Sequence, residues 1–261
     1  EITLLGQNVN SYGRDLYGKP RFADVLDAID STGIERLRFA TSHPKDLTDE
    51  VIAKFGRLRS LMPALHLPVQ SGSDAVLAAM NRRYTREHYL ELVRKLREAC
   101  PDIALSTDVI VGFPGETAKD FEDTYRLIDE VGYHQVFTFI YSKREGTPAA
   151  KIEDPTPREV IQERFDRLVD LVQKHAYELN QPEVGQTVKV LVEGGSKRDE
   201  RMISGKSPKN QTVHALAPEG FTPEEMAGSF VDVKITEAKT WYLTGDVVST
   251  ASNDNSPEAS A

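Results

Sequence analysis

The chain has 261 residues, of which 39% are hydrophobic and 28% charged, so it can bury the core of one large domain or of a large and a small one. Its net charge of −9 argues against nonspecific nucleic-acid binding over the whole surface but leaves room for a local basic patch. One cysteine, Cys100, excludes an internal disulfide and a multi-thiolate metal site within these residues. No apolar run approaches the roughly 20 residues of a membrane helix, and no signal peptide precedes Glu1, so we expect a cytoplasmic protein.

The first residues, 1–5, form a strand-like run without an initiator methionine, which favours a chain shortened at its N-terminus. Four further apolar segments follow at residues 37–40, 65–67, 105–111 and 135–141, and helical periodicity separates each from the next. Such spacing is typical of right-handed βαβ units, so we predict an α/β fold with a partial parallel (β/α) barrel.

Each predicted strand ends in a polar loop that carries Gly or Pro. In a parallel sheet these loops share one rim, where ligands bind. The most regular is the loop at 112–117, where a buried strand ends at Gly112 and Thr117 can cap the next helix. We therefore expect the functional site at this rim.

The pattern of predicted secondary structure changes in the last third of the chain. Residues 156–182 are predicted to form a connecting helix that begins with a capping box of Thr156 and Glu159. Five short alternating segments follow, at 187–192, 201–204, 212–217, 230–235 and 241–247, and predict a small antiparallel β-barrel with the general character of an OB fold. The predicted division is 1–155, 156–182, 183–248 and a disordered tail, 249–261.

Taken singly, the rim loops are weak signals. The loop at 6–8 can be a plain turn, the segment 70–73 can serve only to cap a helix, and His43 and His66 fit structural roles. Taken together, five motifs occur in the order and spacing of one family. They are GQNVNSYG at 6–13, RFATSHP at 38–44, HLPVQSGS at 66–73, TDVIVGFPGET at 107–117 and YSKREGTPA at 141–149. The chain closely resembles the MiaB-type tRNA methylthiotransferases, which are radical S-adenosylmethionine (SAM) enzymes, and its last third resembles their TRAM domain.

The resemblance implies insertion of a methylthio group at C2 of an N6-isopentenyl-adenosine next to the tRNA anticodon. It implies SAM and two [4Fe-4S] clusters as cofactors, tRNA as a partner, and an electron donor such as a flavodoxin or ferredoxin. In the family, a CxxxCxxC loop holds the cluster that cleaves SAM to a 5′-deoxyadenosyl radical. That loop is absent from these residues, so we expect the chain alone to bind no iron and to be inactive.

Motif positions in the family also imply a set of cofactor-binding residues. They are Gly6, Gln7 and Asn8 toward the methionyl amino group, Gln70 and Ser71 toward the ribose and carboxylate, Ile110, Val111, Gly112 and Glu116 around adenine, and Tyr141 and Lys143 closing the pocket. Arg144 is expected to face the RNA. In the C-terminal domain, a run of cations is expected to contact RNA phosphates, and it comprises Lys197, Arg198, Arg201, Lys206 and Lys209.

Other hypotheses remain open at this stage. The chain could be a tRNA-binding module without redox chemistry, which the missing cysteines favour. It could be an ordinary barrel enzyme for a phosphate-bearing metabolite, although such an enzyme needs no second barrel. It could also be a sister methylthiotransferase that acts on threonylcarbamoyl-adenosine or on a ribosomal-protein aspartate.

Overall fold

The computed structural model describes residues 1–40, 42–153, 155–197 and 199–250. The chain divides into two compact units, Glu1–Ala176 and Tyr177–Ala261. The boundary between them in the sequence falls within one long helix, α7 (Arg158–Asn180). Each unit has its own hydrophobic core. In the part of the chain that is described, no helix is both long enough and apolar enough to cross a membrane.

The strands of the first unit are all parallel. β1 (Ile2–Leu4) pairs with β2 (Leu37–Phe39), and β4 (Ala104–Val111) pairs with both β3 (Ala64–His66) and β5 (Gln135–Ile140). A single parallel bridge from Leu37 to Leu61 links the two groups. The predicted parallel α/β architecture is confirmed.

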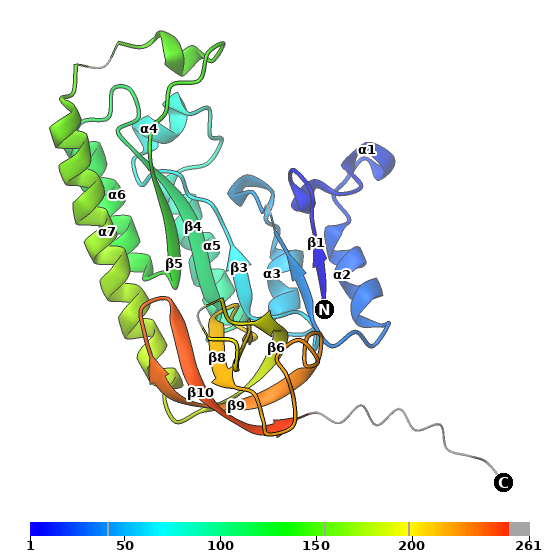
Figure 1. Cartoon of the computed structure of the whole chain (residues 1–261). Coiled ribbons are helices and arrows are strands. Elements are labelled where there is room, and N and C mark those ends of the chain that lie inside the picture. The colour runs from blue at the N-terminus through cyan, green and yellow to red at the C-terminus, as the bar shows by residue number, and fades with distance from the viewer. Residues whose placement is uncertain (41, 154, 198, 251–261) are drawn as a thin grey trace. The chain divides into compact units, whose positions relative to one another are not determined.

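Helices follow each strand and cover the outer side of the sheet (Figure 1). The α-helices of this unit before α7 are α1 (Arg14–Tyr17), α2 (Phe22–Asp30), α3 (Asp49–Phe55), α4 (Asp74–Ala79), α5 (Arg86–Ala99) and α6 (Ala118–Val131), and the 3-10 turns are η1 (Val9–Ser11), η2 (Pro44–Asp46) and η3 (Pro148–Lys151). Polar caps fix where the helices start. The Thr117 side chain accepts from Asp120 N–H while the Asp120 carboxylate accepts from Thr117 N–H, a complete capping box for α6.

The strand β4 shows why one face of the sheet is available for a ligand. From Leu105 onward its residues alternate, with Thr107, Val109 and Val111 buried under the helices and Asp108 and Ile110 half-buried on the opposite face. On β5 that inner face carries Phe137 and Phe139, which are 42% and 51% exposed. Because large apolar side chains are left open to solvent there, this face is suited to a ligand.

The second unit is a closed five-stranded barrel in the order β10-β8-β7-β6-β9. Its elements are η4 (Gln181–Glu183), β6 (Thr187–Gly195), β7 (Met202–Lys206), β8 (Thr212–Leu216), β9 (Phe230–Ala238) and β10 (Tyr242–Thr250). The predicted small barrel is confirmed, although β10 and β8 pair in parallel and the other pairs are antiparallel. β10 runs to Thr250, so the first two residues of the predicted tail are in a strand. The remaining tail, 251–261, lies outside the described residues, and the predicted boundaries at 155 and 182 stay predictions.

Candidate functional site

A cavity of about 670 Å³ opens at the carboxyl ends of β3, β4 and β5. Apolar and aromatic side chains line it together with a few polar and charged ones, the usual composition of a small-molecule site. The polar, charged, aromatic and apolar side chains that line it include Gln70, Arg82, Asp108, Ile110, Phe113, Phe139, Tyr141 and Arg144. They come from β4 and β5, from the loops that follow β3, β4 and β5, and from the connection after α4.

Gln70 shows the clearest sign of a built site. Its φ of +71° lies in the left-handed region, which costs a non-glycine residue of order 1–3 kcal/mol and is met most often at functional positions. Two backbone hydrogen bonds to β4 keep Gln70 in this conformation. Gln70 N–H donates to Asp108 O at 2.9 Å, and Ile110 N–H donates to Gln70 O at 3.0 Å. The surrounding sheet thus fixes an amide side chain at the cavity wall.

The glycine turn after β4 brings the next wall residue into place. Gly112 has a φ of +70°, and a Cβ there would lie 2.7 Å from Ile161 Cγ2 on α7, so a side chain is excluded. The turn presents the Phe113 ring edge-on to Tyr141, with the ring centroids 5.3 Å apart. The Tyr141 hydroxyl is buried and has no hydrogen-bond partner, which is unusual in a native interior and leaves one polar group for a ligand to satisfy.

Glu116 lies behind this turn and is absent from the cavity wall. Its carboxylate is 2% exposed, accepts from Gly112 N–H at 3.2 Å, and is paired with Arg164 of α7 at 2.9 Å. Burial raises the pKa of Glu116, and the hydrogen bonds from Gly112 and Arg164 oppose that rise. The contacts are those of a residue that holds the turn.

The other predicted cofactor residues divide in the same way. Gln70, Ile110 and Tyr141 line the cavity, whereas Ser71 is fully buried and contacts Thr124 of α6 at 3.1 Å. Val111 is in the core, and Lys143 is exposed beside the cavity without lining it. The loop at 6–8 follows β1 in the two-stranded sheet, where Asn8 donates to Asp46 at 2.7 Å, and none of its residues lines the cavity.

Several wall residues were not predicted from the sequence, among them Arg82, Asp108, Phe113 and Phe139. The alternation of Asp108 with Ile110 and of Phe139 with Tyr141 could have indicated two of them, because residues two apart share a sheet face. His66, interpreted as structural, lies on this same face, with Nε2 3.5 Å from Asp108 and Nδ1 3.0 Å from Ser106 Oγ. His43 does have the expected structural role, since its ring accepts from Lys45 N–H at the start of η2.

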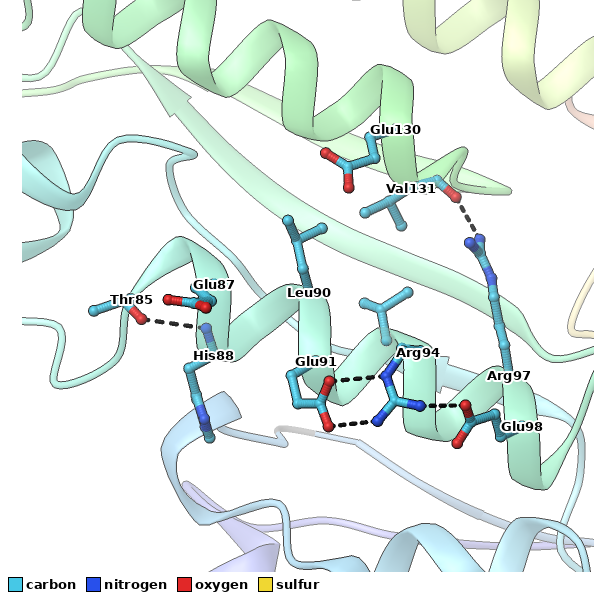
Figure 2. A pocket seen from close by; sticks show the side chains of 11 residues that line it. Thr85, Glu87, His88, Leu90, Glu91, Arg94, Arg97, Glu98, Glu130 and Val131 are labelled. Carbon is cyan, nitrogen blue, oxygen red and sulfur yellow. Dashed lines mark hydrogen bonds and ion pairs between the residues drawn. The ribbon is translucent and has the colours of Figure 1, made fainter.

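A second and larger cavity, of about 890 Å³, is lined by side chains of α5 and of the end of α6, and none of its lining residues belongs to a predicted motif (Figure 2). Its charges satisfy one another, since Arg94 is bonded to Glu91 and Glu98, and Arg97 donates to the carbonyl of Val131. No strand end opens into it. We therefore assign the candidate site to the cavity at the strand ends.

The predicted RNA-contact cations of the second unit do not form one cluster. Lys197 and Arg201 flank the start of β7, while Lys206 and Lys209 lie at its other end. Arg201 is paired with Asp199 at 3.0 Å and Lys209 with Glu183 at 2.8 Å. Arg198 lies outside the described residues.

Comparisons with known proteins agree with this architecture. The family model described as the radical SAM superfamily matches residues 2–128, and the TRAM domain model matches residues 181–248. Residues 2–128 are thus similar to the radical SAM superfamily, and residues 181–248 to the TRAM domain.

Its curated relatives give a narrower grouping. One from Clostridium botulinum (strain Loch Maree / Type A3) is 49% identical over 249 residues, and one from Bacillus thuringiensis (strain Al Hakam) is 50% identical over 252. Both are named tRNA-2-methylthio-N(6)-dimethylallyladenosine synthase, and each alignment covers 95% of this chain. The chain spans about half the length of these relatives, 54% and 48%.

Among solved structures, coproporphyrinogen III oxidase from Escherichia coli, a radical SAM enzyme, matches with a TM-score of 0.44 and 21% identity. The match covers 57% of this chain and 37% of that one.

Proposed function

We propose that this chain is the SAM-binding and RNA-binding part of a tRNA methylthiotransferase that modifies C2 of N6-isopentenyl-adenosine next to the anticodon. The observation that carries the proposal is the near-50% identity to synthases of that name along 95% of the chain. A sequence relation of this strength extends over both units and includes every rim loop.

The cavity at the strand ends fits SAM. Ile110, Phe113 and Phe139 offer an apolar surface for adenine, and Gln70 and Asp108 can hydrogen-bond hydroxyl groups. Arg82 supplies a cation for the carboxylate of the amino-acid moiety. When bound, SAM supplies both the methyl group and the radical chemistry of this superfamily, while these side chains bind and orient it.

The residues present do not fit a [4Fe-4S] cluster. Such a cluster needs several thiolates, and the 261 residues contain only Cys100, at the end of α5. Among the residues that the structure describes, there is no group of three or more His, Cys, Asp or Glu side chains placed to hold a metal ion. We therefore derive no step of the reaction through a cluster.

The same proposal names the partners. The TRAM domain and the relatives' names support tRNA as the substrate, and within it the proposal specifies the anticodon region. A flavodoxin or ferredoxin would supply electrons, and the cytoplasm, where tRNA is modified, would be the location.

Calorimetric titration with SAM and S-adenosylhomocysteine tests the cofactor assignment. We expect the unaltered chain to bind both, and Phe139→Ala to weaken binding about tenfold or more, because it removes an aromatic wall of the site. Phe221→Ala is the matched control, since Phe221 is 55% exposed, near the 51% of Phe139, and belongs to the second unit. Absence of binding, or an equal loss in both variants, would contradict the assignment.

A second candidate function is a tRNA-binding module without catalysis. The single cysteine of the chain favours it, because no cluster can form on these residues. The two candidates differ in the cavity, since a pure RNA-binding module has no need of SAM.

A further inference from the structure

The charge of the rim differs in sign from that of the molecule. The chain as a whole carries −9, yet the connections after the five strands of the first unit are rich in Lys and Arg. Six cations of these connections, counting the one between α4 and α5, are exposed and belong to no ion pair among the described residues. One is Lys151 of η3. We call the other five the rim cations, and they are Lys19, Lys45, Arg83, Lys143 and Arg144. The exposed acids among the described residues of the same connections are Asp15, Glu145 and Glu153.

Contacts between the loops bring two rim cations together on one side of the cavity. The His43 ring meets the Tyr84 ring edge-on with centroids 5.5 Å apart, and His88 Nε2 lies 3.4 Å from Pro44 O. These contacts hold η2, which carries Lys45, against the connection between α4 and α5, which carries Arg83. Arg82, the sequence neighbour of Arg83, also lowers the pKa of His43, after burial as the main cause.

The remaining rim cations lie in other loops of this unit. Arg144 lines the cavity itself, and Lys143 is its exposed neighbour after β5. Lys19 follows α1, the short helix that extends beyond the end of β1 in Figure 1. In the same loop, Tyr17 is 54% exposed and the Arg21 guanidinium lies 5.0 Å from its ring centre. An exposed aromatic ring beside cations is typical of surfaces that bind single-stranded nucleic acid.

We propose that the rim cations form a second RNA-binding surface, on the SAM unit itself and additional to the TRAM domain, which holds the backbone phosphates on either side of the target nucleotide. This rests on the proposed function. A base can react in the cavity only if its own backbone lies at the mouth, so the flanking phosphates fall where these cations are. An acidic molecule gains a local electropositive site in this way without binding nucleic acid everywhere.

The test is binding of a fluorescent anticodon stem-loop RNA to the full chain, measured by anisotropy over a series of NaCl concentrations. The variant Lys45→Ala/Arg83→Ala removes two rim cations, neither of which lines the cavity. We expect weaker binding, and a slope of log affinity against log salt that is smaller by about 1.4, since each phosphate contact to a single strand contributes about 0.7.

The matched control is Arg57→Ala/Arg126→Ala, which makes the same charge change at exposed positions away from the rim, after α3 and on α6. It should leave the slope unchanged. If the rim variant keeps the affinity and slope of the unaltered chain, the inference is overturned while the proposed function stands. If the unaltered chain fails to bind the stem-loop, both fail. If the control variant loses as much slope as the rim variant, the effect is one of net charge and the inference is likewise overturned.

Discussion

At the scale of a single residue, Glu116 affects the candidate site without lining its cavity, because it fixes the turn that carries a wall residue. Its carboxylate holds Gly112 N–H and is neutralised by Arg164, so the glycine turn that carries Phe113 is fastened to α7. The sequence placed Glu116 among the cofactor-binding residues, and its direct contact with SAM stays a prediction. The contacts in the structure make it a positioning residue.

This pair predicts a pH-dependent change in stability. Burial raises the pKa of Glu116 above its value in the unfolded chain, so its favourable contribution is full below about pH 4.3, the ordinary Glu pKa, and is lost as pH rises through the folded pKa. Arg164→Met leaves the buried carboxylate without its partner and raises that pKa further. We expect the free energy of unfolding to fall by about 3–5 kcal/mol at pH 7 and by less at pH 5.

Urea unfolding at both pH values measures this effect. The double variant Glu116→Gln/Arg164→Met is the control, because its side chain at 116 cannot ionise and its loss should be the same at both pH values. A loss in Arg164→Met that does not change with pH would show that packing of the arginine stem, and not the buried charge, is what stabilises the turn.

At the scale of elements, a chain of buried hydroxyl groups joins the helices to the strand that leads to Gln70. Tyr133 donates to the Tyr89 hydroxyl at 2.9 Å, and Tyr89 of α5 donates to Leu67 O at 2.8 Å. Thr107 of β4 donates to the same carbonyl at 2.9 Å and accepts from Val69 N–H at 2.8 Å. The network fixes the segment after β3 against β4 and so positions the cavity wall.

The network predicts unequal costs for removing its two phenolic hydroxyls. Tyr89→Phe leaves the buried Tyr133 hydroxyl without an acceptor and should destabilise the fold by about 1–3 kcal/mol. Tyr133→Phe leaves the bond from Tyr89 to Leu67 in place, so its cost should be about 1 kcal/mol or less. Thermal unfolding of the two variants compares them, and equal costs would contradict this interpretation of the network.

Much of the architecture could be predicted from the sequence. Apolar residues recur every second position in a half-buried strand and about every 3.6 positions in a helix, so these patterns directly reflect burial. The strands at 105–111 and 135–141 and the helix start capped by Thr117 lie within a residue or so of their predicted places. The composition of the cavity wall could not be predicted in the same way. Whether Gln70 or its neighbour Ser71 faces the ligand depends on strand register and on a positive φ, and Arg82 reaches the wall through a loop without periodicity.

For the whole molecule, we propose that SAM binds to the first unit and that RNA binds to both units. The first has a cavity of cofactor size surrounded by cations, and the second is a closed barrel of the TRAM type. Two of the predicted RNA-contact cations of the barrel are held in ion pairs, Arg201 and Lys209, whereas the rim cations are in none among the described residues. The proposed RNA contacts of the first unit therefore rest on cations that have no acidic partner among the described residues.

We propose that this chain is the SAM-binding and RNA-binding part of a methylthiotransferase, and the activity of a hybrid enzyme tests this proposal. The chain is joined in place of the matching part of the Bacillus thuringiensis relative, and the hybrid is expressed in bacteria that lack their own enzyme. Mass spectrometry of nucleosides from digested tRNA then reports the product. We expect 2-methylthio-N6-dimethylallyladenosine at the position next to the anticodon. A folded, cluster-loaded hybrid that leaves only the unthiolated precursor would contradict it.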